Sequence, residues 1–137
     1  MGCEVKAWVV RVAGVQEARC RGAEVRKGYA GGAEFVVASS AATDAGVYGC
    51  SLWCSLNDAI ASCASRPRYF EADGVASVPA EPRKLLVRYR DPMHDVLFIV
   101  AHAPHAMSET SAEQYWESLA SDVRAHSGSS SCQLLLT

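Results

Sequence analysis

The segment that most constrains this chain is residues 96–104, VLFIVAHAP, in which an unbroken apolar run ends at His102. A short continuous apolar run bounded by charged residues and proline is typical of a strand that is buried on both faces. Pro104 favours an extended backbone at Ala103, so His102 should lie at or just beyond the C-terminal end of this strand. There, a histidine either points into a cleft or caps the strand and bonds to a neighbouring carbonyl group.

A second apolar run, residues 12–15, also ends in polar side chains. It predicts a short buried strand that is followed at once by Gln16 and Glu17. A buried carboxylate costs several kcal/mol unless it is paired or bound to a cation. Glu17 therefore has two interpretations, which are a surface ion pair with Arg19 or Arg21 and a metal ligand at a strand end.

Four further segments carry strand patterns: residues 34–39, 47–55, 84–90 and 133–136. The first two are joined by a turn of small residues and should form a hairpin. The strand at 84–90 should pair antiparallel with the central strand through the turn at 91–95. We expect its basic residues to form a solvent-exposed face.

Residues 111 to about 126 are predicted to form a helix. Thr110 and Glu113 fit a capping box at its start, in which each side chain bonds a backbone amide of the first turn. Apolar residues then recur at helical spacing, which predicts that one face packs on a sheet. These residues are Trp116, Leu119, Ala120 and Val123.

Three segments have weaker patterns. Residues 21–32 are charged and rich in glycine and are predicted to form a loop, and residues 74–82 are predicted to be an irregular connection with extended pieces. Residues 56–68 hold a short helical pattern that stops before Pro67. The order of the elements predicts an α/β layered structure, and we expect residues 1–137 to form a single domain.

Charge and hydropathy exclude some classes of protein. The formal net charge of −2 gives no overall basic field toward nucleic acid or acidic lipid, although a divalent metal could supply positive charge locally. No apolar segment reaches transmembrane length, and the first residues lack the long apolar core of a secretion signal. We therefore expect an intracellular protein, nuclear or cytoplasmic, that does not bind a membrane.

The chain holds six cysteines, which without a secretion signal are expected to be reduced and mostly buried. None has the C-x-x-C spacing of a zinc site. His102 and His105 form an H-x-x-H pair, but Pro104 forbids a helix there. A structural zinc site is therefore not expected, and a thiol- or metal-binding protein is the weakest functional hypothesis.

Several segments together resemble the endonuclease/exonuclease/phosphatase superfamily, which has the deoxyribonuclease-like fold. Residues 15–19, VQEAR, resemble its V-Q-E-x-R motif, and residues 48–53, YGCSLW, resemble the hairpin strand that follows. Residues 100–104, VAHAP, resemble its later strand, whose histidine reaches the catalytic cleft. The helix around residues 115–119 and the strand at residues 134–136 follow in the family's order. The likeness is closest to the endonuclease domains of retroelements.

The resemblance implies a fold and a site. The fold is a partial two-sheet α/β sandwich of mixed, mainly antiparallel strands with flanking helices. Glu17 matches the glutamate that binds Mg2+, and His102 matches the catalytic histidine beside the scissile phosphate. Mg2+ neutralises charge that develops on phosphoryl oxygens, and a histidine can donate a hydrogen bond or a proton there. The resemblance also implies nucleic acid as a partner.

The chain departs from the family pattern at both ends. No asparagine-bearing strand precedes residues 12–15, and neither the Gly-Asp-x-Asn motif nor the later Asp-His segment follows Leu136. We therefore expect a truncated domain that is weak or inactive alone, because one carboxylate and one histidine cannot position metal, water and leaving group together. The alternative is a non-catalytic binding module derived from this fold, or a module that a second chain completes.

Overall fold

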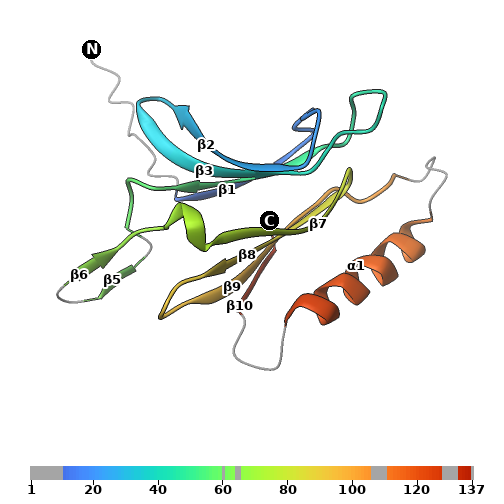
Figure 1. Ribbon diagram of the computed structural model, residues 1–137. Helices are drawn as coiled ribbons and strands as arrows, with labels where there is room; N and C mark the ends of the chain where they lie inside the picture. Colours follow the sequence, from blue (N-terminus) through green and yellow to red (C-terminus); the bar gives the residue numbers. More distant parts are fainter. Residues whose placement is uncertain (1–10, 60, 64–65, 106–110, 128–132, 137) are drawn as a thin grey trace, which may run out of the picture.

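Two β-sheets lie face to face, and a single α-helix covers the outer face of the second sheet (Figure 1). The molecule is mainly β, with antiparallel sheets of four and three strands, a parallel edge strand that extends the second sheet to four, and one helix among the described residues. The predicted α/β class is confirmed only in part, because the strands are mainly antiparallel as expected but the described residues form one α-helix. The computed structural model describes residues 11–59, 61–63, 66–105, 111–127 and 133–136.

The first sheet contains β1 (Val12–Gln16), β2 (Glu24–Ala30), β3 (Ala33–Ser39) and β4 (Cys50–Ser55). Its order is β1-β4-β3-β2, and all neighbouring strands are antiparallel. The predicted hairpin of the third and fourth strands is therefore confirmed. Strand β1, which precedes Glu17, lies at the edge of the sheet.

Strand β2 corrects the loop predicted for residues 21–32. It pairs with β3 along its whole length, from Glu24 opposite Ser39 to Ala30 opposite Ala33. Only Gly28 is buried in this strand, so its sequence lacks the apolar alternation that predicts a strand. An edge strand can form with few buried side chains because its neighbour supplies both the hydrogen bonds and the apolar contacts.

The second sheet contains β7 (Val75–Glu81), β8 (Lys84–Arg90), β9 (Asp95–Ala101) and β10 (Gln133–Leu136). β7, β8 and β9 are antiparallel neighbours, and β10 pairs parallel with β9 at the edge of the sheet. The predicted antiparallel pairing of β8 with β9 and the predicted strand at residues 133–136 are both confirmed.

Strand β7 corrects the irregular connection predicted for residues 74–82. Its pairing with β8 shifts by one residue between Val78 and Ala80, where the chain has Pro79. Proline has no N–H for the ladder and is tolerated at bulges and in edge strands. The bulge interrupts the alternation of inward- and outward-facing side chains, so the sequence pattern does not predict a strand here.

The short helical pattern within residues 56–68 does not form a helix. These residues hold a small hairpin of β5 (Ala61–Cys63) and β6 (Arg66–Arg68), which is followed by the 3-10 turn η1 (Ala72–Gly74). A helical pattern of three apolar positions is too short to nucleate a helix without packing partners.

Helix α1 (Ala112–Ser127) confirms the predicted helix. At its start, Ser111 Oγ accepts a hydrogen bond of 3.1 Å from the backbone amide three residues later, which satisfies a donor that the helix leaves unpaired. Thr110, the predicted cap, lies outside the described residues. Trp116, predicted on the buried face, is 50% exposed, and Tyr115 is buried in its place.

Two hydrophobic cores lie on either side of the second sheet. The core beneath α1 contains Leu86, Leu97, Ile99, Tyr115 and Leu119. The core between the sheets contains Val36, Ala38, Cys50, Leu52, Cys54, Phe70, Leu85, Val87, Tyr89, Phe98 and Val100. Alternate residues of β8 and β9 face opposite layers, which explains why both strands are continuous apolar runs.

A buried ion pair fixes α1 on the second sheet. Lys84 is 2% exposed, and its Nζ donates to Asp122 Oδ2 at 2.5 Å and to Ser118 Oγ at 2.7 Å. Glu81 Oε2 lies 3.4 Å from the same Nζ. Burial acts to lower the pKa of Lys84, but the hydrogen bond to Asp122 and the charges of Glu81 and Asp122 raise it above its ordinary value. The solvent-exposed basic face predicted for residues 84–90 is therefore wrong at Lys84.

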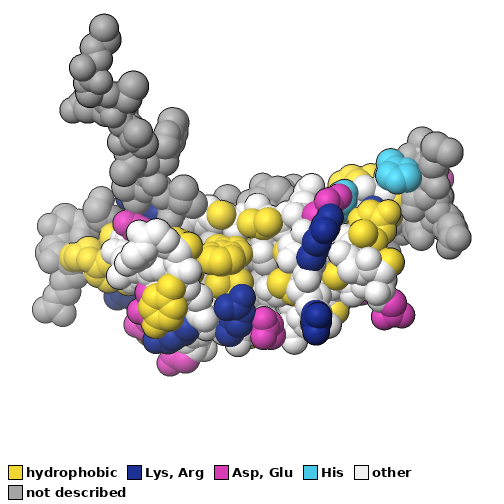
Figure 2. Space-filling view, turned by 90° about the horizontal axis from the view of Figure 1, so that it is seen from above, with side chains coloured by type: hydrophobic (Ala, Val, Ile, Leu, Met, Phe, Trp, Pro, Cys, Tyr) yellow, Lys and Arg dark blue, Asp and Glu magenta, His cyan; other side chains and the backbone are white. Residues whose placement is uncertain are grey.

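The outer face of the first sheet carries hydrophobic side chains between charged ones (Figure 2). Phe35 and Trp53 lie on this face, and their ring centroids are 5.7 Å apart in an edge-to-face contact. Trp53 Nε1 donates to Ser51 Oγ at 3.1 Å. Helix α1 lies on the opposite side of the molecule (Figure 1). None of the described helices is long and apolar enough to cross a membrane.

Candidate functional site

The two residues that the sequence singles out lie at one end of the two-sheet sandwich. Glu17 directly follows β1, and His102 directly follows β9. Gln16 Nε2 donates a hydrogen bond of 2.6 Å to the carbonyl oxygen of Ala101, which joins the two strand ends across the sheets. The structure thus brings Glu17 and His102 into the same region, although 85 residues separate the bonded pair in sequence.

The backbone at this end has an uncommon conformation. Glu17, Arg19 and Tyr48 have φ angles of 55°, 50° and 70°, and they are the only non-glycine residues with positive φ among those described. Ala18 N donates to Gly49 O at 2.6 Å, which bonds the end of β1 to the start of β4. A left-handed backbone costs about 1–2 kcal/mol for such residues, and strained residues cluster at functional sites. Their concentration here is independent support for a site.

Tyr48, which no sequence pattern marks as a site residue, lies beside His102. The two ring centroids are 5.7 Å apart, with an interplanar angle of 66°. Arg83 Cζ lies 3.7 Å from the centroid of the Tyr48 ring, in a cation–π contact. Arg83 belongs to the turn between β7 and β8. Three segments that are distant in sequence therefore contribute adjoining side chains.

The backbone of Arg83 ties the site to helix α1. Its carbonyl oxygen accepts hydrogen bonds from His102 N at 2.8 Å and from Tyr115 Oη at 2.9 Å. Burial raises the pKa of Tyr115 to about 12, so its hydroxyl remains a donor at neutral pH. These bonds fix the backbone of His102 relative to both the β7–β8 turn and the helix.

One ring nitrogen of His102 lacks a partner. The residue is half-buried, and its Nδ1 is buried without a hydrogen-bond partner among the described residues. The bond made by one ring nitrogen of a histidine sets which nitrogen carries the proton. No described residue bonds to Nδ1, so no protein partner at this nitrogen fixes the tautomer of His102.

Glu17 is suited to hold a metal ion only with help from other ligands. Its side chain is exposed and forms no ion pair with Arg19 or Arg21 in the described part of the chain. Mg2+ commonly takes one or two carboxylates and completes its shell with water and phosphate oxygens. No group of three His, Cys, Asp or Glu side chains that could hold a metal occurs within the described ranges. Glu17 thus fits the role of a single protein ligand.

The buried cysteines of the inter-sheet core are unreactive thiols. Burial raises the pKa of Cys50 to about 11, although the charge of Arg83 opposes this shift. Burial also raises the pKa of Cys54 to about 12. Because the thiolate is the form that attacks electrophiles and binds metals, the thiol- or metal-binding hypothesis gains no support from these two residues.

A pocket of about 610 Å³ adjoins the end of β1. It is lined by residues 19–21 and 42–46, which include two arginines, Arg19 and Arg21, and one acidic residue, Asp44. This volume is in the range of pockets that hold small ligands. The lining of this pocket begins two residues after Glu17, and neither Glu17 nor His102 is part of it.

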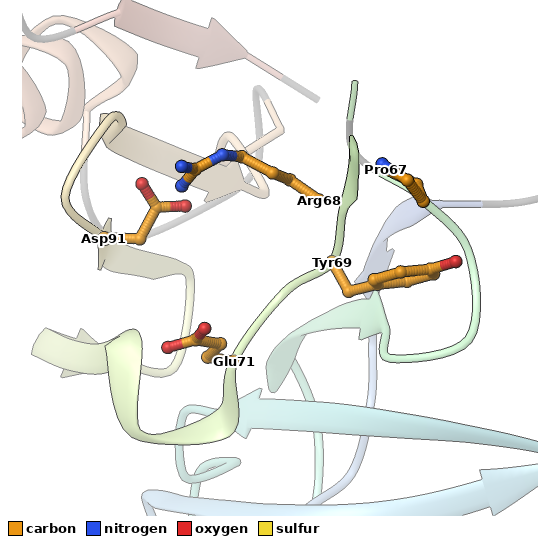
Figure 3. Close-up of a pocket in the computed structure, with 5 residues that line it drawn as sticks. All are labelled: Pro67, Arg68, Tyr69, Glu71 and Asp91. Atoms are coloured by element: carbon orange, nitrogen blue, oxygen red, sulfur yellow. The ribbon is translucent and has the colours of Figure 1, made fainter. Parts of the chain in front are cut away.

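A second pocket, of about 300 Å³, lies at the far end of β9, beside the turn that precedes this strand (Figure 3). The side chains of Arg68, Glu71 and Asp91 point toward a common space there. The oxygens of Asp91 already accept bonds from two backbone amides of the turn, from the His94 ring and from the Tyr89 hydroxyl. Asp91 therefore shapes the turn, and this pocket is not the candidate site.

The end of the sandwich near Glu17 combines a carboxylate, a histidine and an arginine from three segments. These groups can bind a cation, donate a proton or hydrogen bond, and bind an anion. No protein-family model, curated protein sequence or solved structure matches this chain.

Proposed function

We propose that this chain is a metal-dependent phosphodiester hydrolase domain of the endonuclease/exonuclease/phosphatase type whose activity alone is weak. The observation that supports the proposal is the hydrogen bond from Gln16 Nε2 to Ala101 O. It holds together the strand ends that carry Glu17 and His102, the two residues that the sequence resemblance assigns to phosphodiester cleavage. The two mainly antiparallel sheets with a helix on one face agree with the partial sandwich that the resemblance implies.

The roles of the residues follow from their chemistry. Glu17 would hold Mg2+ through its exposed carboxylate, with water and a phosphate oxygen as the other ligands. The bound ion supplies positive charge to the phosphoryl oxygens. The backbone N–H of His102 donates a hydrogen bond to Arg83 O, and the His102 ring contacts the Tyr48 ring. Held in this way, His102 would donate a hydrogen bond to the same phosphate. Nucleic acid is the substrate class that we propose.

A second candidate is a binding module that retains this site without turnover, either alone or after a second chain completes it. The observation that favours it is the single carboxylate of Glu17, because the described residues provide no further cluster of metal ligands. Such a module would bind phosphodiesters but leave them intact.

Hydrolysis of bis-para-nitrophenyl phosphate by the full chain tests the proposal. We expect slow release of nitrophenolate that requires Mg2+, stops with EDTA, and is lost in Glu17→Gln and His102→Asn. Glu24→Gln is a matched control, because Glu24 is also exposed and its only described ion pair is with Arg26. Nitrophenolate release that is equal in wild type and in both site variants would contradict the proposal. Phosphodiester binding without release would identify the binding module.

A further inference from the structure

Arg83 holds its charge against an aromatic ring at the candidate site. The residue is half-buried, and its guanidinium lies over the Tyr48 ring, with Cζ 3.7 Å from the ring centroid. Its Nη1 donates a long bond of 3.4 Å to Ala103 O, and the structure shows no other side-chain bond for Arg83 among the described residues. A guanidinium has five N–H donors, so most of its capacity is unused.

No carboxylate compensates this charge in the described part of the chain. Glu81, the nearest acidic residue in sequence, is 62% exposed and pairs with Lys84 instead. Removing a cation from water is unfavourable unless an anion or several hydrogen bonds replace its hydration. The guanidinium of Arg83 therefore has N–H donors that remain available to bind an anion.

The charge of Arg83 acts on the buried groups around it. Burial raises the pKa values of Cys50 and Tyr115, and in both cases the positive charge of Arg83 opposes the shift. The positive charge of Arg83 therefore acts in the space beside His102, where no carboxylate pairs with it among the described residues. Stacking on an aromatic ring also fixes the plane of a guanidinium, so its fork can bind two oxygens of one phosphate.

We propose that Arg83 binds a phosphoryl oxygen of a phosphodiester at this site, with Tyr48 orienting the guanidinium and His102 lying beside the same phosphate. The inference rests on the proposed function, since it assigns the anion-binding residue of the same site. It adds Arg83, a residue of the β7–β8 turn that no sequence pattern identifies as a site residue.

Equilibrium binding of a short fluorescein-labelled oligodeoxynucleotide, followed by anisotropy in EDTA and then in Mg2+, tests the inference on the full chain. Arg83→Gln should weaken binding about tenfold, the loss expected for a charge-assisted bidentate contact. Arg83→Lys should weaken it by a similar factor, because an ammonium cannot form the fork. Arg124→Gln, which removes the same charge from an exposed position on α1, should change the Kd by less than about twofold.

The salt dependence separates a phosphate contact from a structural role. Loss of one phosphate contact should reduce the slope of log Kd against log salt by about one in Arg83→Gln, which a merely structural role would not do. Equal affinity and slope for wild type and both Arg83 variants would overturn the inference, whereas Glu17-dependent hydrolysis would still support the proposed function. Arg83-dependent binding without hydrolysis supports the inference and favours the binding module. Absence of any binding by wild type would overturn both.

Discussion

Replacing Lys84 with methionine should remove a charge on which the packing of α1 depends. The Lys84 side chain is 3% exposed and bridges the second sheet to Asp122 and Ser118 of the helix. Methionine has similar length, so the substitution fills most of the space while leaving Asp122 without its cation. The perturbation therefore tests the ion pair rather than a cavity.

The expected loss follows from the burial of Lys84 and the partial burial of Asp122. Breaking a fully buried pair costs about 3–5 kcal/mol, because the remaining charge is left without compensation. Asp122 is 25% exposed, so water can reach part of its carboxylate and reduce this cost. We expect a destabilisation of about 2–3 kcal/mol. The pKa of Lys84 is raised in the folded state above its ordinary value of 10.5. The contribution of this charge to the free energy of unfolding is therefore fully present below pH 10.5 and is lost as the pH rises through the folded-state pKa.

Urea unfolding at neutral pH measures this loss, and a slope of about 1–3 kcal/mol per M converts it to a midpoint shift of roughly 1 M. Lys27→Met is the matched control, because Lys27 is 57% exposed and pairs with Glu34 at 3.1 Å. The control should change the free energy of unfolding by less than about 0.5 kcal/mol. Adding Asp122→Leu to Lys84→Met should recover much of the stability. A Lys84→Met protein as stable as the control would refute the reasoning.

Three further changes have expected outcomes. Gly74→Ala should lower the free energy of unfolding by about 1–3 kcal/mol, because a Cβ there would lie 2.6 Å from the carbonyl oxygen of Arg90; wild-type stability in urea would contradict this. Burial acts to raise the pKa of Asp91, but the hydrogen bonds to its carboxylate lower this pKa to about 2. Asp91 therefore stabilises the folded state above pH 3.8, and this contribution is lost as the pH falls through about 2. Asp91→Asn should therefore cost roughly 2 kcal/mol at neutral pH, and a difference from wild type that persists unchanged below the folded pKa would argue against this account. Cys50 and Cys54 should resist iodoacetamide in the folded protein and react in urea, as judged by mass spectrometry; rapid native labelling would show that they are accessible.

The parts of the fold that sequence predicts are those whose local pattern agrees with their final packing. β9 is buried on both faces and appears as an unbroken apolar run, and α1 has both a cap and a helical period. β2 escapes prediction because Gly28 is its one buried residue, and β7 escapes because Pro79 sits where its pairing shifts. In both strands, tertiary pairing rather than local pattern decides the structure.

The candidate site is predictable only one strand at a time. Glu17 and His102 each follow an apolar run and can be identified from it, but the contact between their strands depends on the order of the sheets. No local sequence pattern marks Tyr48 or Arg83 as a site residue. Tyr48 has a positive φ angle just before β4, and Arg83 lies in the tight turn between β7 and β8. Their roles depend on contacts with residues far away in sequence, which a single sequence does not reveal.

The long-range bond between Gln16 and Ala101 also bears on the order in which the protein folds. The β2–β3 and β8–β9 hairpins close short loops, whereas this bond joins residues 85 apart. Closing a longer loop costs more conformational entropy, so the region of Glu17 and His102 should assemble last and open first. Native-state hydrogen exchange should therefore be faster at the amides of Ala18 and His102 than in the centre of β8, and equal protection would contradict this order. Mild destabilisation would then abolish binding at this end while both sheets remain folded.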